Sequence, residues 1–89
     1  MQTLYGYQVM PGSDDTLFFA LTIEECRETA RRQRREMREE TGCPDIGAMA
    51  IYECLFRIDL VSVLEMLNNP DAAHQKLLLS KTLVEVVLD

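Results

Sequence analysis

The first twenty-one residues show the pattern of a β-hairpin. "TLYGYQV" (3–9) alternates in polarity and is rich in aromatic and β-branched residues, and "TLFFAL" (16–21) is a short apolar run; both are typical of strands. The stretch between them, "MPGSDD" (10–15), consists of residues that favour turns. Together they predict two antiparallel strands joined by a loop of about six residues.

Residues 22–41 carry the pattern of a capped helix. Thr22 fits an N-cap with Glu25 at the third helical position, which makes a capping box. Gly42 tolerates the left-handed conformation that ends many helices, and Pro44 prevents a helix from restarting at once. The spacing therefore predicts one long helix over this range.

The middle of the chain predicts a strand followed by a helix. "GAMAIYECLFRID" (47–59) would place apolar side chains on both faces of a strand, which favours a central position in a sheet. "DLVSVLEMLNN" (59–69) repeats Leu and Val at helical spacing, with Asp59 or Ser62 as its N-cap.

The last twenty residues leave an alternative open. Asp71 fits the N-cap of a short third helix over 72–80, but "KLLL" could instead begin a strand. "TLVEVVL" (82–88) is β-branched and predicts a final strand. The order β-β-α-β-α-α-β in 89 residues predicts a single α+β domain. We expect a small, mostly antiparallel sheet of about four strands with helices packed on one face.

The charge of the chain is unevenly distributed. The net charge is −6, yet residues 22–41 hold six Arg and six Glu, so the remainder carries the whole excess of acid. Such a body repels nucleic acid at long range. We expect no membrane span and no signal peptide, because a run of about 18 apolar residues and a basic, apolar N-terminus are both lacking. Three cysteines without C-x-x-C spacing favour reduced thiols in a cytoplasmic protein.

Arginines line up along one edge of the predicted helix. On a helical wheel the narrow apolar stripe consists of Ile23, Cys26, Ala30 and Met37. Beside it, within about 60° of arc, lies the arginine row, which consists of Arg27, Arg31, Arg34 and Arg38. One interpretation is that the row reaches acidic residues of the same chain. The other is that it binds an external anion, above all the carboxylates of a protein partner, since arginine suits two-pronged recognition.

Two further pairs of residues are candidates for partner binding. Tyr5 and Tyr7 would point to the same side of the first strand and, with Tyr52, could line an interface or a small cleft. Alternatively, the three rings border the core with their hydroxyls in water. Asp14 and Asp15 form an acidic hairpin tip, which either aids solubility or contacts a basic protein surface.

Residue patterns for catalysis and metal binding are sparse. His74 is the sole histidine, and a general base needs an oriented carboxylate and a pocket. The sequence shows no phosphate-binding glycine loop, nucleophile elbow or metal-ligand cluster. It therefore predicts no catalytic residue, cofactor or metal.

The succession "LFFALTIEECRETA" then "AIYECLFRIDL" is similar in outline to part of small ADP-ribosyltransferase-like domains. In those domains a strand is followed by a capped helix and then by a further strand. The resemblance implies architecture, since the catalytic His, Tyr and Glu of that family are not matched in this chain.

These observations favour a non-enzymatic, acidic protein-binding module that acts stoichiometrically as an inhibitor or adaptor. A phage or mobile-element anti-defence protein is one setting that fits its size and charge. We also expect a homodimer, because sheet edges in so small a domain invite pairing. Two alternatives stay open: a minimal or degenerate ADP-ribosyltransferase-like enzyme, and an RNA-contacting module that uses the arginine-rich helix.

Overall fold

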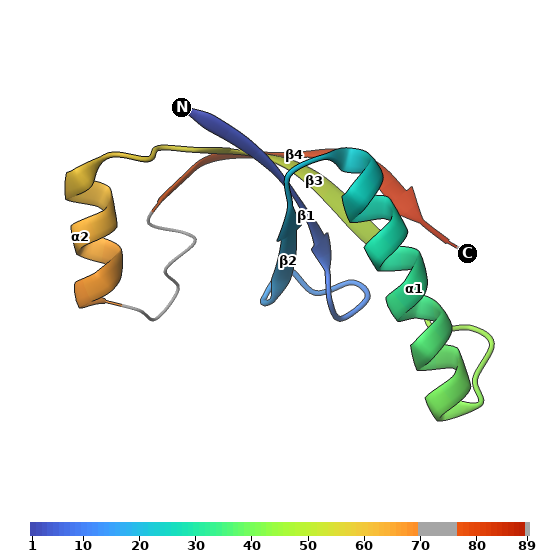
Figure 1. Ribbon diagram of the computed structural model, residues 1–89. Coiled ribbons are helices and arrows are strands. Elements are labelled where there is room, and N and C mark those ends of the chain that lie inside the picture. Colours follow the sequence, from blue (N-terminus) through green and yellow to red (C-terminus); the bar gives the residue numbers. More distant parts are fainter. Residues whose placement is uncertain (70–76, 89) are drawn as a thin grey trace.

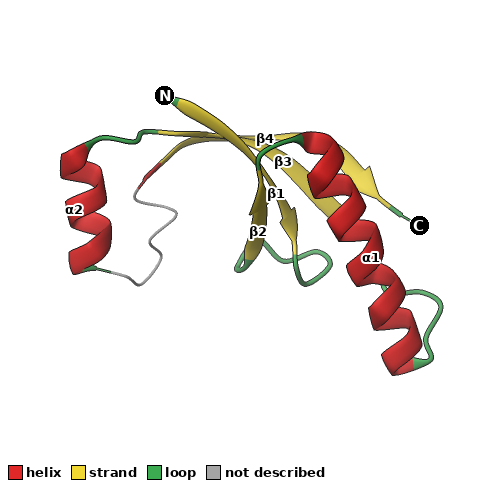
Figure 2. Cartoon of the chain, in the orientation of Figure 1, coloured by secondary structure: helices red, strands yellow, loops and turns green. Residues whose placement is uncertain are grey.

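A computed structural model describes residues 1–69 and 77–88 and shows a four-stranded sheet with two helices in those ranges (Figure 1, Figure 2). The elements in chain order are β1 (Gln2–Gln8), β2 (Leu17–Ala20), α1 (Ile23–Thr41), β3 (Met49–Phe56), α2 (Leu60–Asn68) and β4 (Leu78–Val87). The predicted α+β class with an antiparallel sheet is confirmed.

The sheet has the strand order β2-β1-β3-β4, and every neighbouring pair is antiparallel. β1 and β2 form the predicted hairpin, in which the Val9 N–H donates to Thr16 O at 3.2 Å beyond the last paired residues. β3 is central, as its two apolar faces predicted, because it pairs with β1 on one side and β4 on the other. The edges are β2, which has four residues, and β4, whose pairing with β3 shifts register at two places.

α1 begins and ends where the sequence predicts. Thr22 Oγ1 accepts a hydrogen bond from the Glu25 N–H at 3.1 Å, as a capping residue should. Gly42 has a φ of 66°, which strains residues with a Cβ, and its N–H donates to Arg38 O at 2.9 Å. The helix packs on one face of the sheet (Figure 1). The core between them consists of Tyr7, Ala20, Cys26, Ala30, Met49, Ile51 and Val87.

The junction between β3 and α2 shows which residue caps the second helix. β3 ends at Phe56 rather than at residue 59. Asp59 Oδ1 accepts from the Ser62 N–H at 2.8 Å, so Asp59 is the N-cap and Ser62 is its partner. Hydrogen bonding from Ser62 also lowers the pKa of the Asp59 carboxyl.

β4 begins at Leu78, earlier than the predicted start at residue 82. Leu78 pairs with Phe56 and Ser80 with Leu55, so residues 78–80 are strand, the alternative that the sequence left open. Residues 72–76 of the predicted third helix, including His74, and its expected cap Asp71 lie outside the described residues.

α2 projects from the end of the molecule opposite α1 (Figure 1). None of its residues is buried. The β3–β4 ribbon that carries it continues past the paired strands, where the Arg57 N–H donates to Leu77 O at 2.8 Å. The molecule measures 45 × 23 × 17 Å, and its radius of gyration is 14.3 Å, against about 12 Å for a compact chain of this length. This projecting segment, residues 57–69, is the α2 arm.

Candidate functional site

The fold divides the arginine row between internal and surface positions. Arg27 is partly exposed and Arg34 is buried. Arg31 is exposed, and Arg38 is half-buried in the last turn of α1, where a basic side chain is favoured by the helix dipole. The four side chains therefore do not form one uniform external surface.

Arg27 forms a two-pronged ion pair with Glu85 of β4. Its Nε lies 2.6 Å from Glu85 Oε2, and its Nη2 lies 2.9 Å from Oε1. Hydrogen bonding to Glu85 raises the pKa of Arg27. The intramolecular interpretation of the row is therefore the one observed at this position, where the pair joins the first turns of α1 to the edge of the sheet.

Arg34 occupies the buried side of α1. It is 3% exposed and follows Cys26 and Ala30 at helical spacing, so it continues the apolar stripe instead of flanking it. Its Nη1 donates to Gly47 O, and its Nη2 donates to Leu88 O at 2.9 Å. Arg34 thus joins α1 to the loop before β3 and to the end of β4. This corrects the prediction that placed Arg34 on a partner-binding surface.

Tyr5 and Tyr7 lie on the face of the sheet that α1 covers, and Tyr52 lies on the other face. Tyr7 is 2% exposed, its hydroxyl donates to Gln33 Oε1 on α1, and burial raises its pKa. Tyr5 is at the border of the same core, where its hydroxyl donates to Glu53 Oε2 at 3.4 Å. Tyr52 belongs to the opposite face. A common cleft lined by all three is therefore not formed.

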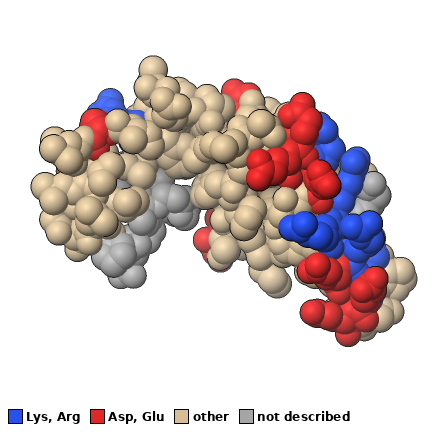
Figure 3. Space-filling model, in the orientation of Figure 1, with Lys and Arg blue, Asp and Glu red and all other residues tan. Residues whose placement is uncertain are grey.

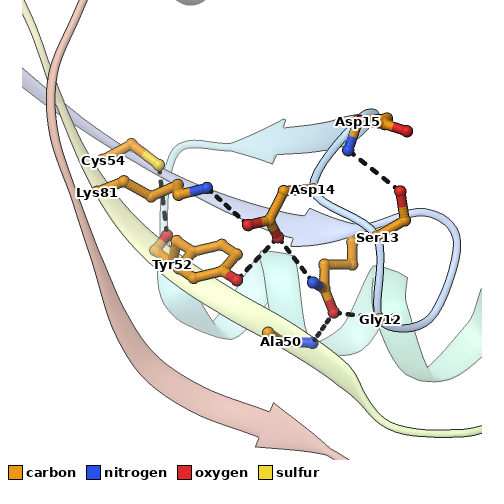
Figure 4. Close-up of polar contacts among 9 residues, drawn as sticks. Gly12, Ser13, Asp14, Asp15, Ala50, Tyr52, Cys54 and Lys81 are labelled. Atoms are coloured by element: carbon orange, nitrogen blue, oxygen red, sulfur yellow. Dashed lines mark hydrogen bonds and ion pairs between the residues drawn. The ribbon is translucent and has the colours of Figure 1, made fainter.

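Asp14 lies at the centre of a polar cluster on the face away from α1 (Figure 4). Its Oδ1 accepts from Gln8 Nε2 at 2.7 Å and from the Tyr52 hydroxyl at 2.8 Å. Its Oδ2 accepts from Lys81 Nζ at 2.9 Å, and this ammonium lies 4.6 Å from the centre of the Tyr52 ring. Hydrogen bonds from Lys81, then Gln8 and Tyr52, lower the pKa of Asp14 from 3.8 to about 2.

Gln8 ties this cluster to the backbone. It is 6% exposed, and its Oε1 accepts from the Gly12 N–H at 3.2 Å and the Ala50 N–H at 2.9 Å. The cluster thus fastens the β1–β2 loop to β3 and β4. Asp14 and Asp15 are both exposed at the hairpin tip, and the carboxylate of Asp14 also serves this internal role.

The titratable groups with shifted pKa values are moved away from neutrality. Burial raises the pKa of Cys26 to about 11 and also raises that of Cys54. Cys43 is an exposed free thiol whose Sγ donates to Asp45 O at 3.2 Å. Within residues 1–69 and 77–88, no three His, Cys, Asp or Glu side chains gather as a metal site.

A groove of about 260 Å³ lies between α1 and the β1–β2 hairpin. Phe18 is 48% exposed beside it and packs on Tyr7 with ring centroids 5.6 Å apart. Arg32 and Glu36 lie one helical turn apart on the exposed side of α1. In Figure 3, basic side chains over α1 lie between two groups of acidic ones. The α1 groove, as we name it, is lined by Tyr7, Phe18, Thr29, Arg32, Gln33 and Glu36.

Phe18 and Arg32 are not among the residues that the sequence predicts to bind a partner. A usable signal was the Phe18–Phe19 pair in "LFFA", because adjacent side chains of a strand point to opposite faces of the sheet. Phe19 reaches over Gly6 to meet Phe56 edge-on, with ring centroids 5.4 Å apart, while Phe18 faces the side of α1. The two adjacent aromatic rings therefore lie on opposite faces of the sheet and pack against different residues.

Comparisons of the chain with protein-family models, curated proteins and solved structures gave no match. In the described part of the chain, no helix has the length and apolar character needed to cross a membrane.

Proposed function

We propose that the chain is a non-enzymatic protein-binding module that acts by stoichiometric contact, as an inhibitor or adaptor, through the α1 groove. Phe18 carries this proposal, because a ring that is 48% exposed beside a groove offers a partner a large apolar contact. Tyr7 supports the ring from below, so Phe18 is held in place before a partner arrives.

The composition of the groove supports a protein as the ligand. Aromatic residues and Arg are the side chains that dominate binding energy at protein interfaces, especially around a central pocket. Arg32 and Glu36 present both signs of charge at the groove, which suits a surface that also carries both signs. Nucleic acid is disfavoured as the ligand, because Glu36 and the net charge of −6 would repel phosphates.

The protonation states support contact over catalysis. A general acid or base works best with a pKa near the working pH. In contrast, Asp14 has a pKa of about 2 and Cys26 a pKa of about 11, while the pKa values of Tyr7 and Tyr52 are raised. Asp14 therefore stays ionised at neutral pH, and Cys26, Tyr7 and Tyr52 stay protonated. Hydrogen bonds and burial within the fold keep them in these states.

A charge reversal at the groove, with a matched control, tests this function. Arg32→Glu changes the groove, whereas Arg35→Glu makes the same change at another exposed position of α1. Both variants should keep the far-UV circular dichroism and melting temperature of the wild type. Capture of the partner from a lysate of the native host, quantified by mass spectrometry, should fall at least about tenfold for Arg32→Glu and remain for Arg35→Glu. Equal capture by the two variants would show that the α1 groove is not the contact.

A further inference from the structure

In the part of the chain that the structure describes, the α2 arm presents a largely exposed apolar surface. Leu60, Val61, Leu64 and Leu67 are each 55% to 83% exposed. Three of them, Leu60, Leu64 and Leu67, share one side of the helix at i, i+4 and i+7. A helix of nine residues is not stable by itself in water and depends on packing of its apolar side. Within residues 1–69 and 77–88, the sheet does not supply this packing.

β4 presents a second uncovered apolar surface. Its exposed apolar side chains, together with the residue that follows it, are 41% to 71% exposed: Leu79, Leu83, Val84, Val86 and Leu88. Leu83 and Val86 pair with Tyr52 and Ala50 of β3, which places them on the face of the sheet that α1 does not cover.

We propose that these two surfaces cover each other between two copies of the chain, in a two-fold symmetric dimer in which the α2 arm of each copy packs on β4 of its partner. In such an arrangement each chain contributes both surfaces, as a two-fold interface requires. An arm held away from its own sheet is also the starting geometry for exchange of an element between copies. The α1 groove takes no part in this contact, so the dimer does not depend on the function proposed above.

The areas distinguish reciprocal exchange from contact between the arms alone. A fully exposed aliphatic side chain offers roughly 100 Å² of apolar surface, so the exposures above correspond to roughly 270 Å² on the arm and roughly 260 Å² on β4. Interfaces are about 57% apolar, so contact between two arms alone would bury roughly 950 Å² in total, below the ~1,200 Å² of a stable interface. Reciprocal burial of arm and β4 gives roughly 1,900 Å², which is within the standard range.

Shape and charge at the base of the arm favour a second copy. A groove of about 420 Å³ lies there, with Leu60, Val61 and Leu79 among its apolar lining residues. Charged residues of the arm are limited to Arg57, Asp59 and Glu65, so the segment carries a net charge of only −1 from one basic and two acidic residues. Repulsion between two acidic chains is therefore weakest where the copies would meet.

The register shifts of β4 indicate whether the two copies meet through side chains or through a continuous sheet. They fall between Ile51 and Tyr52 and between Leu55 and Phe56 of its partner strand. Irregularities of this kind at a sheet edge disfavour pairing with another strand. The dimer is therefore held by side chains of the arm and β4, and not by a sheet that continues from one copy into the next.

A complementary pair of variants tests the exchange. Leu64→Glu changes the arm, Leu83→Lys changes β4, and Leu21→Glu is the matched control, since Leu21 is 75% exposed but belongs to neither surface. Sedimentation equilibrium of the full chain should give a dimer for the wild type and for Leu21→Glu. Each of the other two variants should raise the dissociation constant at least about tenfold. Their equimolar mixture should recover the dimer, because it combines one native contact with one new Glu–Lys contact.

Several results would overturn the proposal that the α2 arm of each copy packs on β4 of the other. A wild type that stays monomeric over the concentration range would mean that the arm serves a different protein, and the groove test would still stand. A Leu83→Lys variant as dimeric as the wild type would indicate contact between arms, and a monomeric mixture would exclude reciprocity. If a variant loses its circular dichroism spectrum, nuclear Overhauser effects between labelled and unlabelled wild-type chains decide: arm-to-β4 methyl contacts support the exchange, and their absence in a dimer refutes it.

Discussion

Arg34→Met should lower the free energy of unfolding by removing a clamp from the centre of the fold. Arg34 is 3% exposed, and its guanidinium donates to Gly47 O and Leu88 O, so it joins three segments that are remote in sequence. Methionine keeps much of the aliphatic volume, so the substitution removes the donors and the charge with little loss of packing.

The magnitude follows from opposing terms. A hydrogen bond to a charged group contributes about 1.5–3 kcal/mol net, and Arg34 forms two with backbone carbonyls. Part of this is regained, because removing the guanidinium also removes the desolvation of a buried charge. Water can reach the two acceptor residues, Gly47 and Leu88, which are exposed. We expect a net loss of about 2–3 kcal/mol, from a total that is about 4–13 kcal/mol for a domain of this length.

Urea unfolding followed by far-UV circular dichroism measures this loss. With a slope of about 1 kcal/mol per M for a small domain, the midpoint should fall by about 2–3 M. Arg35→Met is the control, because Arg35 is exposed on the same helix and should change stability by less than about 0.5 kcal/mol. Equal midpoints for the two variants would refute the clamp and would return Arg34 to the surface row that the sequence suggested.

Two further predictions concern the polar cluster and the thiols. The pKa of Asp14 is lowered from 3.8 to about 2 in the folded chain, so its contribution is present above about pH 4 and is lost as the pH falls through about 2. Asp14→Asn should therefore be less stable than the wild type near neutral pH, by under about 1 kcal/mol because the side chain is nearly half exposed; a gap that is unchanged at about pH 2 in urea titrations would contradict this assignment. Iodoacetamide should modify exposed Cys43 well before buried Cys26 and Cys54, as measured by mass spectrometry, and equal rates in the folded chain would contradict the observed burial.

The ends of α1 could be predicted from the sequence because capping is a local interaction. Thr22 and Glu25 lie within one turn, and Gly42 sets the backbone at its own position. The start of β4 could not be predicted in the same way, because Leu78 is a strand residue only through its pairing with Phe56. Helix and strand are hard to distinguish in a short apolar run such as "KLLL".

The predicted arginine row failed at Arg34 for a related reason. A helical wheel orders side chains by angle and assigns charged ones to water. It contains no information on carbonyl groups that other segments bring to the helix, such as Gly47 O and Leu88 O. The same limit explains why the internal partners of Asp14 could not be predicted, since Gln8, Tyr52 and Lys81 meet only in the folded sheet.

The α1 groove lies on the face of the sheet that α1 covers, whereas the proposed dimer contact uses the α2 arm and the other face of β4, and this separation has a consequence for binding. The α1 groove has six lining residues, against the roughly 20–30 residues that each side of a stable interface contributes. In the proposed dimer, in which each arm packs on β4 of the partner, both grooves would stay uncovered, because they lie on the other face of the sheet. The two α1 grooves of one dimer would reinforce each other when a partner carries two matching sites, because the second contact forms at a high effective concentration. Under the proposed function, binding to such a partner would therefore depend on the arm as much as on the groove.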